Sequence, residues 1–168
     1  MTIIAPDQGT MINALMTHKV DVADLPSGGV AIIEGVLPPG EFIGPHTHER
    51  EDEISYILQG TVTFLVGGVE QMACAGSYVL KPRGVPHAFW NAGDTPARVM
   101  EIHTPGGFEH FYDDMEVIMR APDRSDAERM TAFAETAARY GVRHHVAEGA
   151  QLHARLTLPS PPHGPAHP

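Results

Sequence analysis

The sequence predicts an all-β domain followed by a C-terminal α-helical appendage. Glycine and proline, 17 and 15 of the 168 residues, separate short apolar runs between residues 30 and 104. Short apolar runs divided by such turn residues are typical of β-strands. After residue 105 the apolar residues recur with a spacing near 3.6, the period of an amphipathic helix. We therefore expect strands in the first part of the chain and helices after them.

Seven strands are expected, and the chain is expected to divide into three parts. The strands cover residues 30–37, 53–58, 61–66, 69–73, 78–80, 86–91 and 98–104. The three parts are a β-domain (1–106), a helical extension packed on it (107–157) and a disordered tail rich in proline and histidine (158–168).

The segment around Gln59 and Gly60 is expected to form a β-hairpin. A two-residue loop at this position would pair Ile57 with Val62. Alternation along the strands then places Glu53 on the same face as these apolar side chains. A lone buried carboxylate is expensive unless it is neutralised, paired or bound to a metal. Glu53 is therefore a candidate functional residue.

Two apolar stripes predict the helices of the appendage. The first stripe includes Phe108 and Tyr112. The second helix is expected to begin at Ser125, whose hydroxyl can cap it while Glu128 completes a capping box. It is expected to end at Gly141.

The charge balance excludes some classes of partner. The single cysteine excludes an intramolecular disulfide framework and a multi-cysteine zinc site. The formal net charge of −10 disfavours partners that are themselves negatively charged. Nucleic acids and anionic lipids both require a positive face. The longest uncharged stretch, residues 54–69, is interrupted by polar residues and glycines, and the first ten residues lack the features of a secretory signal. We expect a cytoplasmic protein with no nucleic-acid or membrane partner.

Three histidines and one glutamate form a candidate metal site. His46 and His48 are one residue apart, so on an extended segment both side chains lie on the same face. Glu53 follows on the next strand, and His87 follows a turn rich in proline and glycine. A lone histidine is more often a core or surface residue than a ligand. Three imidazoles and a carboxylate together, however, suit a borderline divalent metal.

These four residues belong to two motifs that resemble those of the cupin superfamily. The first is G, five residues, H-x-H, four residues, E, six residues, G; the second is G, five residues, P-x-G, two residues, H, three residues, N. The matching residues are Gly40, His46, His48, Glu53, Gly60, Gly76, Pro82, Gly84, His87 and Asn91. The resemblance implies a double-stranded β-helix, the cupin or jelly-roll barrel, that usually dimerises. It also implies one divalent transition metal (Mn, Fe, Co, Ni or Zn) bound by His46, His48, Glu53 and His87.

The expected pocket around this metal is apolar and aromatic. Its expected lining is Ile33, Ser55, Ile57, Phe64, Phe89, Met100 and Ile102. In strand 98–104, His103 lies on the face opposite Met100 and Ile102, and parity alone does not decide which face points inward. We expect Met100 and Ile102 to point inward. Sugar-phosphate isomerases and oxalate enzymes need a cationic group, so an apolar lining disfavours both, although Arg98 keeps them open.

Residues 103–114 (HTPGGFEHFYDD) resemble the C-terminal region of quercetin-dioxygenase-like single-domain cupins. The resemblance implies a metal-dependent dioxygenase that cleaves a flavonol or similar enolic aromatic compound with O2, with Glu53 as the base. Two alternatives stay open: a redox-silent cyclase or isomerase of the aromatic polyketide type, and a non-catalytic cupin that binds a small molecule.

Overall fold

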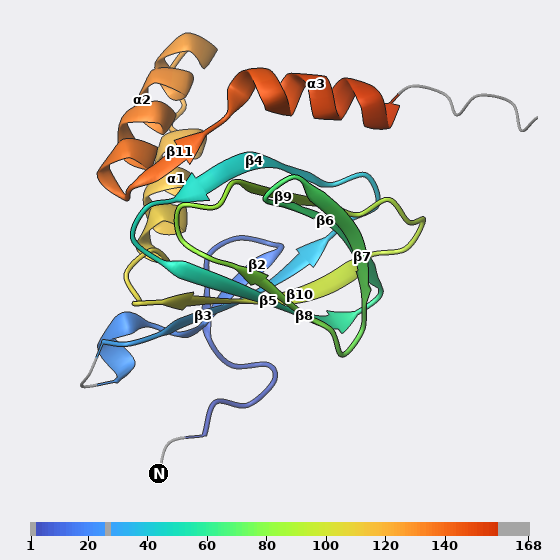
Figure 1. The fold of residues 1–168 in the computed structure, drawn as a ribbon. Helices are drawn as coiled ribbons and strands as arrows, with labels where there is room; N and C mark the ends of the chain where they lie inside the picture. The colour runs from blue at the N-terminus through green and yellow to red at the C-terminus, as the bar shows by residue number, and fades with distance from the viewer. Residues whose placement is uncertain (1–2, 26–27, 158–168) are drawn as a thin grey trace, which may run out of the picture.

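Two antiparallel β-sheets face each other and enclose the interior of the molecule (Figure 1). The computed structural model describes residues 3–25 and 28–157. In spatial order, the first sheet contains β1 (Thr10–Met11), β2 (Met16–Val20), β3 (Ala31–Leu37), β10 (Ala97–Thr104), β5 (Asp52–Gln59) and β8 (Tyr78–Lys81). The second contains β11 (Val142–His144), β4 (Phe42–His48), β9 (His87–Trp90), β6 (Thr61–Val66) and β7 (Val69–Cys74).

The predicted all-β architecture of this part of the chain is confirmed. Each of the seven expected strands is present, with bounds that differ by no more than a residue at either end. Four further strands, β1, β2, β4 and β11, were not among those expected. β1 and β2 lie at one end of the first sheet and β11 at one end of the second, whereas β4 was expected only as the extended segment that carries His46 and His48. A short 3-10 helix, Val22–Asp24, links β2 to the segment that precedes β3.

The expected hairpin around Gly60 is wrong, because β5 and β6 lie in different sheets. Ile57 pairs with Val99 of β10, whereas Val62 pairs with Ala73 of β7. Gly60 forms the corner between the sheets with a φ of 79°, and a Cβ there would lie 3.1 Å from the Cα of Ala97. The expected inward faces are nevertheless correct, since both strands turn the same side chains toward one shared interior.

The expected orientation of β10 is also wrong. Glu101 and His103 are buried, whereas Met100 and Ile102 lie on the opposite face and are only partly buried. Glu101 forms an ion pair with the buried Lys81, and Nε2 of His103 lies 3.3 Å from Oε1 of Glu53. Met100 and Ile102 therefore do not line a central pocket.

The apolar core fills the space between the sheets. Its buried members are Leu37, Ile57, Val62, Phe64, Ala73, Phe89, Ala97 and Val99. Phe64 of β6 and Phe89 of β9 stack with ring centroids 5.4 Å apart, so the second sheet contributes aromatic side chains to this core.

Three helices follow β10, with β11 between the second and the third, and Figure 1 shows α3 lying over β4 with α1 and α2 grouped beside it. They are α1 (His110–Arg120), α2 (Asp126–Arg139) and α3 (Val146–Thr157). The capping box of Ser125 and Glu128 is confirmed, since each side chain bonds the other's backbone N–H. Within the described ranges, every helix is too short or too polar to cross a bilayer. The expected disordered tail, 158–168, lies outside the described residues.

Candidate metal centre

The four predicted metal ligands come together between the two sheets. His46 and His48 project from β4, and His87 of β9 pairs directly with His46 in the strand ladder. Glu53 reaches the same point from β5 of the opposing sheet. One ligand atom from each residue lies within 4.8 Å of all the others, and all four side chains are buried.

Local backbone structure aims the imidazoles at this point. The β4–β9 ladder shifts register between Ile43 and His46, where Pro45 lacks an N–H donor. The Gly44 carbonyl lies 2.8 Å from Nδ1 of His46, and the Val85 carbonyl lies 3.0 Å from Nδ1 of His87. A carbonyl only accepts, so each Nδ1 carries a proton and donates it to the backbone, and each Nε2 is the ring nitrogen available to a metal.

Buried atoms without partners show that these residues fit a divalent metal. Nε2 of His87 and Oε2 of Glu53 are 2.9 Å apart, yet neither has a hydrogen-bond partner of acceptable geometry among the described residues. Unpartnered buried polar atoms are rare and need an explanation such as a bound ion. Three imidazole nitrogens and one carboxylate oxygen are donors that transition metals accept.

The charge state of His46 also suits a metal ligand. Burial, reinforced by the neighbouring His87, holds the pKa of the His46 imidazole well below its usual range. His46 is therefore neutral at pH 7. Neutral imidazole is the form that binds metals, so no proton has to be displaced there.

A buried charged network stands behind Glu53, and sequence reasoning missed it. Nζ of Lys81 lies 3.0 Å from Oε1 of Glu53 and 2.8 Å from Oε2 of Glu101. Nε2 of His103 lies 3.3 Å from the same Oε1 of Glu53. Although burial alone raises the pKa of the Glu53 carboxyl, Lys81 and the histidines hold it well below its usual range.

The alternation of β8 contained a signal for Lys81. In this strand Val79 packs against the core and Lys81 is buried, while Tyr78 and Leu80 are exposed. A period of two starting from Val79 therefore puts Lys81 inside. The expected lining of the pocket did not include this buried lysine.

A largely apolar cavity of about 520 Å³ reaches His46 and Glu53. Ile33 and Phe89 line it as expected. Much of its remaining wall is aromatic and comes from the C-terminal extension: Phe108, Phe111, Tyr112 and Phe133. No arginine or lysine is found among the described residues that line it.

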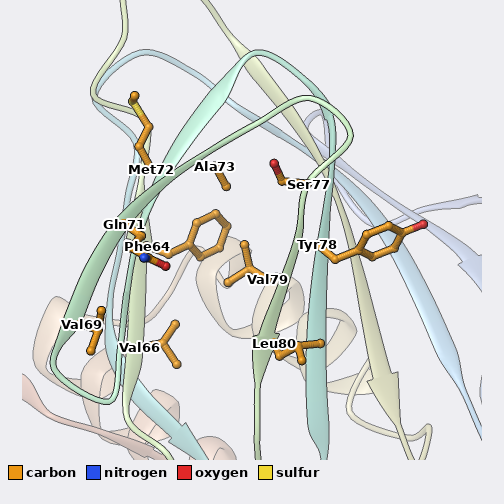
Figure 2. Close-up of a pocket in the computed structure, with 10 residues that line it drawn as sticks. All are labelled: Phe64, Val66, Val69, Gln71, Met72, Ala73, Ser77, Tyr78, Val79 and Leu80. Carbon is orange, nitrogen blue, oxygen red and sulfur yellow. The ribbon is translucent and has the colours of Figure 1, made fainter.

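The other expected pocket residues lie elsewhere. Ile57 packs in the core, and Ser55 donates hydrogen bonds to both carboxylate oxygens of Glu101. Phe64 lines a second cavity, of about 430 Å³, between β7 and β8 (Figure 2). Met100 and Ile102 face outward, as described above.

Comparison with known proteins shows what part of this chain is similar to. Residues 34–103 match the family model of the Cupin domain. The two sheets are those of a double-stranded β-helix, so the predicted fold class is confirmed. A "predicted oxalate decarboxylase" from Thermotoga maritima superposes with a TM-score of 0.51 at 29% identity, covering 53% of this chain and 77% of that one.

Two curated relatives are each similar to part of this chain. The tetracenomycin polyketide synthase protein TcmJ of Streptomyces glaucescens is 33% identical over 102 residues, 60% of this chain and 66% of the relative. The oxalate-binding protein of Thermotoga maritima is 36% identical over 66 residues, 39% of this chain and 54% of the relative. The match thus spans about two thirds of one relative and about half of the other.

Proposed function

We propose that this chain, in which residues 34–103 form a cupin domain, is a metal-dependent dioxygenase that cleaves a planar enolic aromatic compound of the flavonol type with O2. One observation carries the proposal: the cavity with aromatic walls ends at His46 and Glu53. An apolar pocket with a few convergent polar groups is the usual form of a small-molecule site. A flat ring would be held by its faces and would present one oxygen to the metal.

Each part of the site has a role in this proposal. His46, His48, His87 and Glu53 would hold the ion. A bound divalent metal would supply Lewis acidity toward a substrate oxygen, and a redox-active one would also support reaction with O2. The aromatic wall would orient the ring and exclude water.

Glu53 is proposed as the acceptor of the enol proton. Its pairing with Lys81 stabilises the carboxylate and makes it a weak base. A weak base can remove only an acidic proton, such as that of an enolic hydroxyl next to a carbonyl. The substrate class is therefore limited to compounds with such a hydroxyl.

The test is oxygen-dependent turnover of quercetin. Protein loaded with Mn, Fe, Co or Ni is incubated with quercetin in air and under anaerobic conditions, and the flavonol absorbance is followed. We expect loss of absorbance only in air, and a rate lowered about 100-fold or more by Glu53→Gln, since general bases contribute about 10²–10⁴-fold. Glu70→Gln, the same change at an exposed residue of β7, is the matched control and should keep the full rate. No oxygen-dependent loss with any of these metals would contradict the flavonol proposal.

A second candidate function is a redox-silent ring closure of the aromatic polyketide type. The 33% identity to the tetracenomycin polyketide synthase protein favours it. The same cavity would hold a folded poly-β-ketone chain, and zinc would suffice as the metal. Zinc-dependent cyclisation of such a chain without O2 uptake would support this candidate over the dioxygenase.

A non-catalytic binding role is the third possibility, and the oxalate-binding relative favours it. It predicts no turnover of any aromatic compound and nearly unchanged ligand affinity after Glu53→Gln. Isothermal titration with quercetin and with oxalate measures that affinity directly.

We also propose that the chain forms a homodimer in the cytoplasm. Apolar side chains at the free sheet edges support the dimer: Met72 is 75% exposed, Tyr78 68% and Leu80 66%. Light scattering after size exclusion measures the mass. We expect about twice the chain mass, and a shift to the monomer in Met72→Lys and Leu80→Lys.

A further inference from the structure

The two oxygens of Glu53 have different surroundings. Oε2 faces the histidines of the metal site and lies 2.9 Å from Nε2 of His87 and 3.5 Å from Nε2 of His48. Oε1 points the other way, 3.0 Å from Nζ of Lys81 and 3.3 Å from Nε2 of His103. One oxygen is therefore held by the protein, and the other is left without a hydrogen-bond partner among the described side chains.

Lys81 is itself fixed by buried partners. Its ammonium group donates to Oε2 of Glu101, and Ser55 donates to both oxygens of that carboxylate at 2.9 and 2.7 Å. The ammonium also lies 4.9 Å from the ring centroid of Phe89. Lys81 and Ser55 are almost fully buried, so solvent does not screen these contacts.

Charge balance explains why Glu101 accompanies Lys81. A lone buried ammonium would neutralise Glu53 and reduce its attraction for a metal cation. Because Glu101 supplies a second carboxylate, Lys81 and Glu101 balance each other and Glu53 keeps its charge for the metal. Burying three charges is costly, and an apolar core would be at least as stable, so stability alone does not account for this network.

We propose that Lys81, held by Glu101, is a positioning residue that retains Oε1 of Glu53 and leaves Oε2 alone to bind the metal. The inference rests on the metal site of the proposed function, but not on the dioxygenase reaction. A carboxylate bound through one oxygen leaves more open coordination positions than one bound through two. Lys81 would thereby keep room for substrate at the metal.

The test uses the double variant Lys81→Met/Glu101→Gln, which removes both charges without leaving either unpaired. Co2+ is the probe, because its visible spectrum reports the number and geometry of its ligands. We expect the Co2+ affinity to fall about 10–100-fold, the usual cost of losing a partner of a metal ligand. We also expect the visible bands to change, since the released Glu53 can bind through both oxygens. An unchanged affinity and spectrum would overturn the proposal.

A destabilised control separates positioning from general loosening of the fold. Asn91 is buried and bonds the Leu37 and Thr95 carbonyls and the Gly93 N–H, and none of these groups belongs to the metal site. Asn91→Ala should lower the unfolding free energy but leave the Co2+ spectrum as in the wild type. The same spectral change in Asn91→Ala would contradict a specific role for Lys81.

A second measurement needs no variant. In a crystal structure of the Co2+-loaded wild-type protein, we expect Oε2 alone on the ion and Oε1 still on Lys81. Coordination through both oxygens would overturn the inference, even if the double variant did not fold. Failure of the wild-type protein to bind Co2+ would instead overturn the metal site itself, and this inference with it.

Discussion

Glu53 connects the interior of the barrel to its proposed chemistry. One of its oxygens belongs to a network of buried charges, and the other belongs to a group of three histidines. Both contacts depend on a single side chain that β5 turns inward. A substitution at Glu53 therefore removes both the ion pair with Lys81 and the proposed metal ligand. The roles of Lys81 and of the three histidines have to be tested by substituting those residues instead.

Asp52, next to Glu53, gives a residue-scale prediction about pH. Arg83 donates to its carboxylate from the guanidinium and from the backbone N–H, which lowers the pKa of Asp52 to about 2. The carboxylate is thus favoured in the folded state, so this contribution to stability is present above about pH 4 and is lost as the pH falls toward 2. Arg83→Ala should raise the pKa only partway to its ordinary value, because the backbone donor stays.

Carbon-detected NMR titration of the Asp52 carboxyl measures this pKa. Arg98→Ala, which removes a comparable surface pair with Glu34, is the control and should leave Asp52 unchanged. An ordinary pKa in the wild-type protein would contradict the pairing. The pair also ties the start of β5 to the turn that precedes His87.

At the residue scale, sequence predicts contacts set by local spacing better than contacts set by distant partners. His46, His48, Glu53 and His87 were predicted because their spacing fits known motifs, and they do come together. Met100 and Ile102 were expected inside, but Glu101 and His103 point inward instead, beside Lys81 of β8 and Glu53 of β5. No pattern within β10 itself contains that information.

At the scale of elements, seven strands and the inward faces of β5 and β6 were predictable, but the facing of β10 and the strand pairing were not. Alternation correctly put Ile57 and Val62 inside. The hairpin failed because Gly60 allows a corner between sheets as readily as a tight turn within one. The choice is made by β10 and β9, which pair with β5 and β6 from far along the chain.

The capping box of α2 gives the prediction for this scale. Ser125→Ala removes the cap and the hydroxyl that bonds Glu128, so we expect a loss of about 1 kcal/mol in the unfolding free energy. Urea denaturation measures it. Thr131→Ala is the control in the same helix, since that hydroxyl only bonds back to the Ala127 carbonyl, and we expect a change within about 0.5 kcal/mol. Equal losses in the two variants would contradict the cap.

At the scale of the whole molecule, the C-terminal extension contributes to the barrel and to the site. β11 adds a strand beside β4, with Val142 opposite His48 and His144 opposite His46. The extension also supplies Phe108 and Phe111 to the cavity wall. The metal ligands of β4 thus lie between β9 on one side and the extension on the other.

This arrangement predicts a single cooperative unfolding transition. Trp90 of β9 is the only tryptophan and packs with Leu152 of α3, so its fluorescence reports the barrel and its contact with the extension. Far-UV circular dichroism reports the helices. We expect the two urea transitions to coincide. Separate midpoints would show that residues 107–157 unfold independently.

The central claim is that His46, His48, Glu53 and His87 hold one transition metal. The measurement is the metal content, by mass spectrometry, of protein purified without a histidine tag and loaded with Mn, Fe, Co, Ni or Zn. We expect one ion per chain, less than a tenth of that in His87→Ala, and full loading after removal of residues 158–168 with their two histidines. Loading that falls equally in the tail-deleted protein, or no stoichiometric loading with any of the five metals, would contradict the account.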